Sequence, residues 1–335
     1  MSRNGADIGI TGVGVVSPAG WGLPAMLECL RSQQPVPTIA HTVPETGHEY
    51  LRLPVPKPDK LNAIFRTPRL RRSSAVSRYM CAAAFEALGE HGLAKVRSDN
   101  FRLGIVVSCY TGCVNYSERF YKEVLEDPIT ASPIVFPETV FNAPSSHLSA
   151  LLESSEMNYT LVGDESQFLS AIELGINWIL DEGMDGVLVA AGEENNWLSA
   201  EGLSMFREMP VLGEGGCALL LEPCDGGGVR IEAITDRLSY NSLLSRDEVL
   251  RSMRAQLPDE TKADLLLESM NEEGVWDDFT GQKINVCALM GEGFGVSTAW
   301  SCAAAAGFLR AGDIDSAIVS GIGMDQSCAA MVVSK

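Results

Sequence analysis

Residues 8–20 read Ile-Gly-Ile-Thr-Gly-Val-Gly-Val-Val-Ser-Pro-Ala-Gly. β-Branched residues alternate with glycines and the run closes in a turn, which predicts a buried strand. Gly12 and Gly14 resemble the start of a dinucleotide-binding loop, but Pro18 and Gly20 interrupt the helix that such a loop requires. The stretch therefore predicts the first strand of a layered fold and argues against a nucleotide site.

Strand and helix patterns alternate along the rest of the chain. Short continuous apolar runs predict buried strands, and alanine-rich or amphipathic runs predict helices. Such alternation is typical of an α/β fold. Strands are predicted over 103–108, 186–192, 216–221, 229–234, 264–267, 284–289 and 316–320, and helices over 74–88, 166–180, 246–256 and 297–310. Residues 32–69 contain seven prolines and predict an irregular excursion over the surface.

Two parts of the sequence repeat one pattern. Residues 183–192 and 312–321 each leave a helix, pass an aspartate and form an apolar strand that closes on glycine. A glycine-rich spacer at 225–228 marks the seam between them. We therefore predict an N-terminal half over residues 1–223 and a shortened C-terminal half over residues 224–335.

Composition excludes several classes of function. The 335 residues carry a formal net charge of −19, which argues against a nucleic acid partner. The apolar runs are shorter than the roughly 20 residues that span a bilayer, so membrane insertion is not expected. The N-terminus has no secretory pattern and the nine cysteines include no CxxC pair, so we expect a cytoplasmic protein with reduced thiols, no metal and no cofactor.

The positive charge is unevenly distributed. Residues 1–110 carry 13 Lys and Arg against 8 Asp and Glu, whereas the rest of the chain carries 12 against 36. Arg66, Arg69, Arg71 and Arg72 form the densest basic cluster. They are either a solvated helix start or a docking patch for an acidic protein such as a carrier protein.

Four landmarks, taken in order, resemble the β-ketoacyl synthases, which are condensing enzymes of the thiolase superfamily. Residues 10–20 look like the first strand and turn of that family, and 78–88 look like its Ala-Ala-x-Glu-Ala-Leu helix. Residues 163–194 are similar to its nucleophile helix and next strand, and 320–329 to its glycine-rich closing strands. The resemblance implies an α/β, thiolase-like five-layer αβαβα sandwich, built from two related halves, that pairs two-fold.

The resemblance also implies catalytic groups that this sequence lacks. Condensation in that family uses a cysteine nucleophile at a helix N-terminus and two histidines in the second half. All four histidines lie at or before position 147. Anchoring on the nucleophile helix places Glu165 at the cysteine position with Ser166 beside it, and Met270 and Glu292 near the two histidine positions. Ordinary Claisen condensation is therefore not expected.

The replacements leave three interpretations open. Acidic and hydroxyl side chains at a helix start are favourable without any chemistry. Alternatively, Glu165 and Glu292 face one buried cleft and share a proton, which would allow general acid or general base catalysis. In a third interpretation Ser166 is the nucleophile of a hydrolase, but the G-x-S-x-G motif of a nucleophile elbow does not surround it.

The function that these observations favour is a non-condensing subunit that resembles a chain-length factor. It would pair with an active ketosynthase in polyketide, aryl polyene or fatty acid biosynthesis and meet an acyl carrier protein. The alternatives are an altered enzyme, acting as a malonyl-carrier-protein decarboxylase or acyl hydrolase, and an acyl-binding or structural homodimer.

Overall fold

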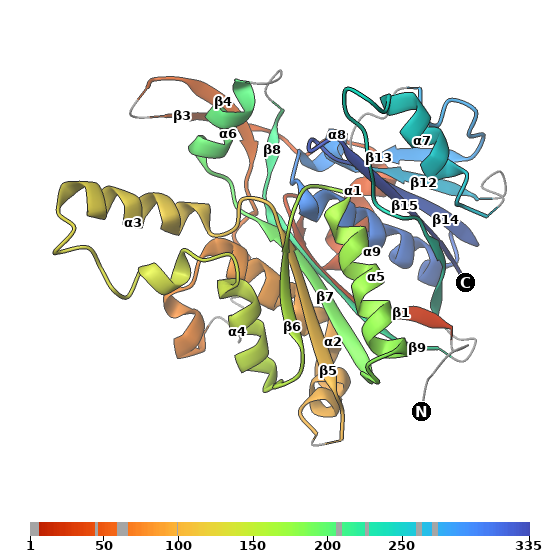
Figure 1. Cartoon of the computed structure of the whole chain (residues 1–335), viewed down its shortest axis with the longest axis horizontal. Coiled ribbons are helices and arrows are strands. Elements are labelled where there is room, and N and C mark those ends of the chain that lie inside the picture. The colour runs from red at the N-terminus through yellow and green to blue at the C-terminus, as the bar shows by residue number, and fades with distance from the viewer. Residues whose placement is uncertain are drawn as a thin grey trace.

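The computed structural model describes residues 7–43, 46–58, 66–98, 100–205, 210–224, 228–258, 263–269 and 274–335. Figure 1 shows long strands running through the molecule, with helices on both sides of them. None of the helices in these ranges is both long and apolar enough to cross a membrane.

The first half of the chain forms five strands in the spatial order β6-β5-β7-β9-β1. The three strands β6, β5 and β7 are parallel, and β9 runs antiparallel to β7 and β1. Every residue of β5 and β7 is buried, as their unbroken apolar sequences predict. The strands are β1 (Ile8–Ser17), β5 (Leu103–Cys109), β6 (Asn158–Val162), β7 (Gly186–Glu193) and β9 (Gly215–Pro223).

The second half repeats this arrangement in the order β13-β12-β14-β15-β10. Strands β13, β12 and β14 are parallel, and β15 is antiparallel to β14 and β10. A short antiparallel pairing of β1 with β10 joins the halves into one hydrogen-bonded sheet, so the division at residue 223 stays a prediction. The strands are β10 (Val229–Ile234), β12 (Leu265–Glu268), β13 (Gln282–Asn285), β14 (Ser316–Ile322) and β15 (Ser327–Ser334), with β2 (Gly20–Trp21) and β11 (Leu238–Ser239) beside them.

Helices divide the molecule into layers. Helices α5 (Gln167–Leu180) and α9 (Gly295–Ala311) lie between the two halves, and each contacts strands of both. Helices α2 (Ala75–Val96) and α4 (Ala143–Leu152) cover the outer face of the first half, and α7 (Arg246–Arg254) packs on the second. The expected five-layer sandwich with two related halves is therefore confirmed.

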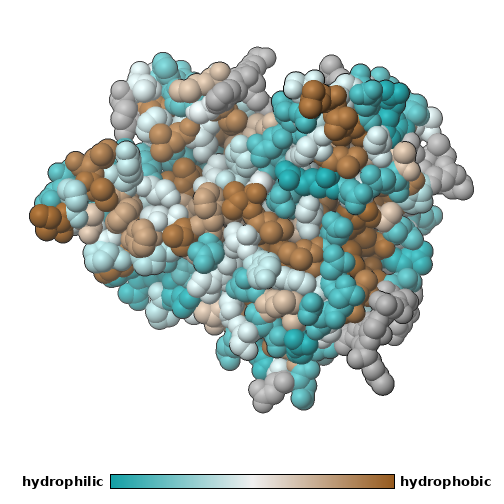
Figure 2. All heavy atoms as spheres, viewed as in Figure 1, coloured by the Kyte–Doolittle hydropathy of each residue, from teal (hydrophilic) through white to brown (hydrophobic). Residues whose placement is uncertain are grey.

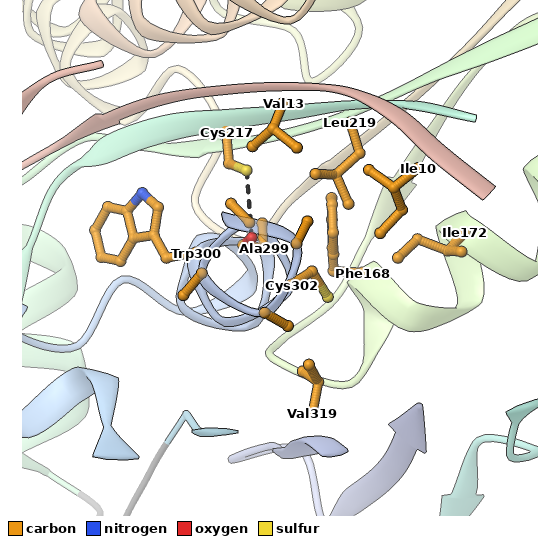
Figure 3. Packing of buried hydrophobic residues seen from close by; sticks show 14 of the residues in the cluster. Ile10, Val13, Phe168, Ile172, Cys217, Leu219, Ala299, Trp300, Cys302 and Val319 are labelled. Carbon is orange, nitrogen blue, oxygen red and sulfur yellow. Dashed lines mark hydrogen bonds between the residues drawn. The ribbon is translucent and has the colours of Figure 1, made fainter. Parts of the chain in front are cut away.

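The middle of the main core is helix α9. All residues from Gly295 to Leu309 are buried, because sheets enclose this helix on both sides. Its many alanines allow that close approach, and apolar side chains from both halves surround it in Figure 3. The N-terminal part of the helix is tied to the first half, since Trp300 Nε1 donates a hydrogen bond to the Val16 carbonyl (3.2 Å) and Cys217 Sγ contacts the Ala299 carbonyl (3.3 Å).

Gly12 and Gly14 let helix α2 pack directly on β1. A Cβ atom at Gly14 would lie 1.9 Å from the Ala83 carbonyl oxygen, and one at Gly12 would lie 2.2 Å from that of Ala87. The alternation of glycines at the start of the chain is therefore explained by packing between a strand and a helix.

Two predicted elements were wrong. Residues 32–69 are not irregular throughout, because they contain β3 (Ile39–Thr42) and β4 (Glu49–Leu53), which form a small separate sheet with β8 (Leu212–Gly213). The strand predicted over 284–289 is the second. Strand β13 ends at Asn285, whose side chain accepts a hydrogen bond from the Ala288 N–H (2.8 Å) and caps the helix that begins there. The remaining elements are α1 (Leu23–Ser32), η2 (Pro68–Arg72), α3 (Val114–Glu126), η3 (Phe136–Glu138), α6 (Trp197–Ser204) and α8 (Val286–Met290).

Candidate functional site

The predicted nucleophile position lies in the turn between β6 and α5. The Glu165 side chain there has no exposed surface, and neither of its carboxyl oxygens has a hydrogen-bond partner among the described residues. Burial, the charge of Glu292 and the charge of Asp164 raise the pKa of Glu165 well above its usual value. Burial and these two neighbours favour the neutral acid, because the charged form would lose its hydration.

Glu292 lies near this group, in the loop between α8 and α9. It is almost fully buried, and its Oε1 accepts hydrogen bonds from the Phe294 N–H (2.7 Å) and the Ser297 hydroxyl (3.4 Å). The structure thus brings together two of the residues singled out from the sequence. Met270, near the other histidine position, lies outside the described residues.

Ser166 belongs to a polar cluster that contains no histidine. Its hydroxyl accepts a hydrogen bond from Arg237 Nε (2.7 Å) and is 2.8 Å from the hydroxyl of Ser327. The cluster also includes Asp164, whose carboxylate accepts a hydrogen bond from the Asp325 N–H (2.6 Å) and lies 3.7 Å from Arg237 Nη2. The Ser166 hydroxyl also donates to Asp164 Oδ1 (3.3 Å), but Arg237 and the Asp325 N–H already engage that carboxylate, so the geometry supports a structural role for this serine.

His147 does not serve as a base for Ser166, because it is paired elsewhere. It lies in α4, and its Nε2 pairs with Glu138 of η3 at 3.0 Å. This contact joins α4 to the segment that follows α3, on the outer face of the first half.

The cysteines offer no replacement thiolate at the site. Cys287 is the cysteine whose environment involves Glu165 and Glu292, and burial together with the charge of Glu292 raises the pKa of its thiol well above the usual value. Burial also raises the pKa of Cys109 and Cys217. These sulfurs stay protonated at neutral pH and are therefore poor nucleophiles. No cluster of described side chains is suited to hold a metal ion.

Two further buried carboxylates lie at the C-terminal end of β7 (Gly186–Glu193). Glu193 accepts hydrogen bonds from the backbone N–H groups of Tyr110 and Thr111, and burial raises its pKa to about 7. Glu194 accepts from the N–H groups of Ala75 and Asn115. Both side chains satisfy backbone donors at the starts of loops and helices, which is a structural task.

The basic cluster is on the surface. Arg66, Arg69, Arg71 and Arg72 are all exposed, on or beside η2 just before α2. Arg69 also makes long hydrogen bonds to the carbonyl (3.3 Å) and hydroxyl (3.4 Å) of Ser146 in α4. The cluster therefore presents positive charge to solvent on a strongly acidic chain.

An apolar surface extends over α3 and the segment after it, and Figure 2 shows hydrophobic residues gathered there. A groove of about 620 Å³ runs between α3 and α6 and is lined mainly by apolar side chains, among them Phe120, Tyr121, Leu125 and Trp197. Further exposed apolar residues are Ile129, Ile134, Phe136, Val140 and Phe141. We call this region the α3 face.

Residues 6–232 match the family model described as beta-ketoacyl synthase, N-terminal domain. The chain belongs to the β-ketoacyl synthase family. A comparison with the curated proteins gave no match.

Solved structures of ketosynthases share this β-ketoacyl synthase fold over the whole chain. The chain is similar to the ishigamide ketosynthase/chain length factor (14% identity, TM-score 0.81, covering 98% of this chain and 99% of that one). It is also similar to AntDE:AntF, a type II polyketide synthase acyl-carrier protein in complex with its ketosynthase (19%, 0.80, 100% and 99%). A third match is the ketosynthase ApeO with its chain length factor ApeC from Xenorhabdus doucetiae (12%, 0.76, 100% and 99%).

The sequence located part of this site and missed the rest. Landmarks on either side of 165 and 292 singled out Glu165, Ser166 and Glu292. Arg237 was missed because it lies in an irregular segment after β10, 71 residues from Ser166 in sequence. No local pattern marks such a residue.

Proposed function

We propose that the chain is a non-condensing subunit of chain-length-factor type, which pairs with an active ketosynthase in polyketide, aryl polyene or fatty acid biosynthesis. The observation that carries the proposal is the fully buried Glu165, at the predicted nucleophile position, whose pKa is raised well above its usual value by burial and by Glu292. A neutral carboxylic acid that solvent does not reach has neither the nucleophilicity of a thiolate nor access to a thioester. The partner would supply the cysteine and histidines.

The free edge of the sheet supports pairing. Strand β6 ends the strand order and hydrogen-bonds only to β5 among the described strands. Its exposed side chains include Tyr159 (55% exposed) and Val162 (51%), and the strand has no charged residue or proline to prevent addition of another strand. The opposite edge, β13, is shorter and exposes Lys283. Edge-to-edge pairing is therefore favoured at β6.

The α3 face adds apolar surface for the same partner. Residues such as Ile129, which is 93% exposed, are unfavourable in water and are favourable at a subunit interface. In two of the matching structures a ketosynthase is held with a chain length factor, as their names state. A ketosynthase is therefore the partner that we propose for this face.

The basic cluster supports an encounter with a carrier protein. Arg71 and Arg72 lie in the most positive region of a chain whose net charge is −19. An acidic carrier protein would be repelled by most of this surface and attracted to the cluster. One matching structure contains an acyl-carrier protein with its ketosynthase.

The proposal is tested with acyl and malonyl thioesters of a carrier protein. The purified chain alone should show no covalent adduct by intact mass and release no carbon dioxide or free acid, whereas addition of a cysteine-bearing ketosynthase should give condensation product. Turnover by the chain alone that disappears in Glu165→Gln or Ser166→Ala would instead establish the altered-enzyme alternative.

A further inference from the structure

An aromatic pair lies between the α3 face and Glu165. The ring of Tyr110 stacks on that of Phe294, with centroids 5.0 Å apart and planes 22° apart. Phe294 belongs to a small apolar cluster against which Tyr110 and Trp197 also pack, and Trp197 lines the groove beside α3. The cluster is therefore continuous from the groove on the surface to the aromatic pair.

The inner side of the pair faces the carboxyl groups. Phe294 follows Glu292 closely in the chain, and its N–H donates to the Glu292 carboxylate (2.7 Å). The next residue, Gly295, packs on the backbone of Gly163 and Asp164, since a Cβ there would lie 3.4 Å and 3.6 Å from their carbonyl oxygens. Burial raises the pKa of Tyr110 to about 12, and the nearby carboxylates of Asp325 and Asp164 add to this shift.

The pair is also fixed in place. Phe294 has φ 49° and ψ −128°, a backbone conformation that residues other than glycine rarely adopt. Such strain persists only where surrounding contacts over-determine it, and it is concentrated at functional positions. Tyr110 is held by hydrogen bonds from its own N–H to Glu193 and from its hydroxyl to Asp325 (3.4 Å). The contacts thus come from both halves of the chain.

We propose that Tyr110 and Phe294 are specificity-determining residues whose stacked rings close the route from the α3 groove to Glu165. The inference rests on the proposed function and adds that this subunit excludes an acyl chain from its own pocket. A growing chain is then confined to the partner and the groove. Glu165 has no exposed surface, as this closure requires.

The test measures whether Glu165 can be reached. Carbodiimide coupling of glycinamide, mapped by peptide mass spectrometry, should leave Glu165 unmodified in the wild-type chain and modify it in Tyr110→Ala. The Phe294→Gly variant should behave the same way, and its backbone suits glycine, so it provides a second variant should Tyr110→Ala not fold. Tyr116→Ala is the matched control, because that ring lies on α3 with its hydroxyl on the Arg72 carbonyl.

The ligand used is the dodecanoyl thioester of pantetheine. Both opened variants should bind it at least about tenfold more tightly than the wild-type chain, and bound ligand should protect Glu165 from coupling. Modification of Glu165 in the folded wild-type chain would overturn the proposal, as would an unmodified Glu165 in a folded Tyr110→Ala or Phe294→Gly variant. None of these readouts requires the partner, so a failure to pair with a ketosynthase is a separate result.

Discussion

At position 165, burial and two neighbouring carboxyl groups decide the protonation state. Burial opposes ionisation of Glu165, and Glu292 and Asp164 oppose it further. A group whose pKa is raised in the folded state contributes stability that is complete below its unfolded pKa and is lost as the pH rises through the folded pKa. Glu165 therefore destabilises the fold in alkaline solution.

Replacing Glu165 with glutamine removes this ionisation while keeping the shape of the side chain. We expect Glu165→Gln to be within about 1 kcal/mol of the wild-type chain near pH 5 and to be the more stable protein near pH 9, by more than about 1 kcal/mol. Urea unfolding at the two pH values measures the difference. If the two proteins differed in their free energy of unfolding by the same amount at both pH values, Glu165 would not be held as a buried acid.

Sequence landmarks predict which residues stand at a family's fixed positions, and Glu165 and Glu292 were singled out in this way; their assignment to the nucleophile and histidine positions stays a prediction. They do not find residues that tertiary contacts bring in from elsewhere. Tyr110 and Phe294 are 184 positions apart in sequence. They meet only because β5 and the start of α9 lie side by side in the folded chain. Single-sequence reasoning has no signal for such a pair.

At the scale of elements, the contact between β1 and α2 depends on two glycines. We expect Gly14→Ala to destabilise the protein by about 3 kcal/mol or more, because the new Cβ would overlap the Ala83 carbonyl and neither backbone can move without breaking its hydrogen bonds. The control is Gly202→Ala in α6, where a Cβ would meet nothing within 4 Å. That change should be neutral or stabilise by up to about 1 kcal/mol. Equal unfolding free energies for the two variants would contradict the packing.

The short helix η2 carries the second prediction at this scale. Reversing the charge in Arg71→Glu and Arg72→Glu should weaken binding of an acyl carrier protein by about tenfold, and the wild-type affinity should fall as salt is added. Surface plasmon resonance at two ionic strengths measures both effects. Arg230→Glu, an exposed change on β10 in the other half, is the control. A loss of affinity as large in the control as in the η2 variants would show that only total charge matters.

Predicting the elements themselves succeeded where burial imposed one pattern. Apolar runs such as 103–108 and 186–192 gave strands close to the observed bounds, because both faces of those strands are covered. Prediction failed at 32–69, where short exposed strands with mixed polarity carry no alternating signal. It also failed at 286–290, where an asparagine cap changes an apolar run from strand to helix.

For the whole molecule, buried carboxyl groups and net charge act in the same direction. The pKa values of Glu86, Asp164, Glu165, Glu194 and Glu268 are raised by burial, and that of Glu193 is raised to about 7. Their contribution to stability is complete below about pH 4.5 and is lost as the pH rises through the folded values. Carboxyl groups with lowered pKa values, such as Glu123 and Glu248, lose their contribution only in more acidic solution.

We therefore expect the free energy of unfolding to fall as the pH rises from about 5 to about 7.5. Urea titrations at intervals across this range give the slope. Glu193→Gln should make the slope smaller, because this residue then no longer releases a proton near neutral pH. A stability that rises steadily towards pH 8 would contradict the assigned protonation states.

The central claim is that this chain supplies no condensing chemistry and completes a partner's dimer through β6 and the α3 face. Native mass spectrometry of the chain co-expressed with a cysteine-bearing ketosynthase tests it most directly. The account predicts a complex containing one copy of each protein, which is lost or strongly reduced in Val162→Asp on the exposed edge strand. Recovery of the chain only as a monomer or homodimer, or a complex indifferent to Val162→Asp, would contradict the account.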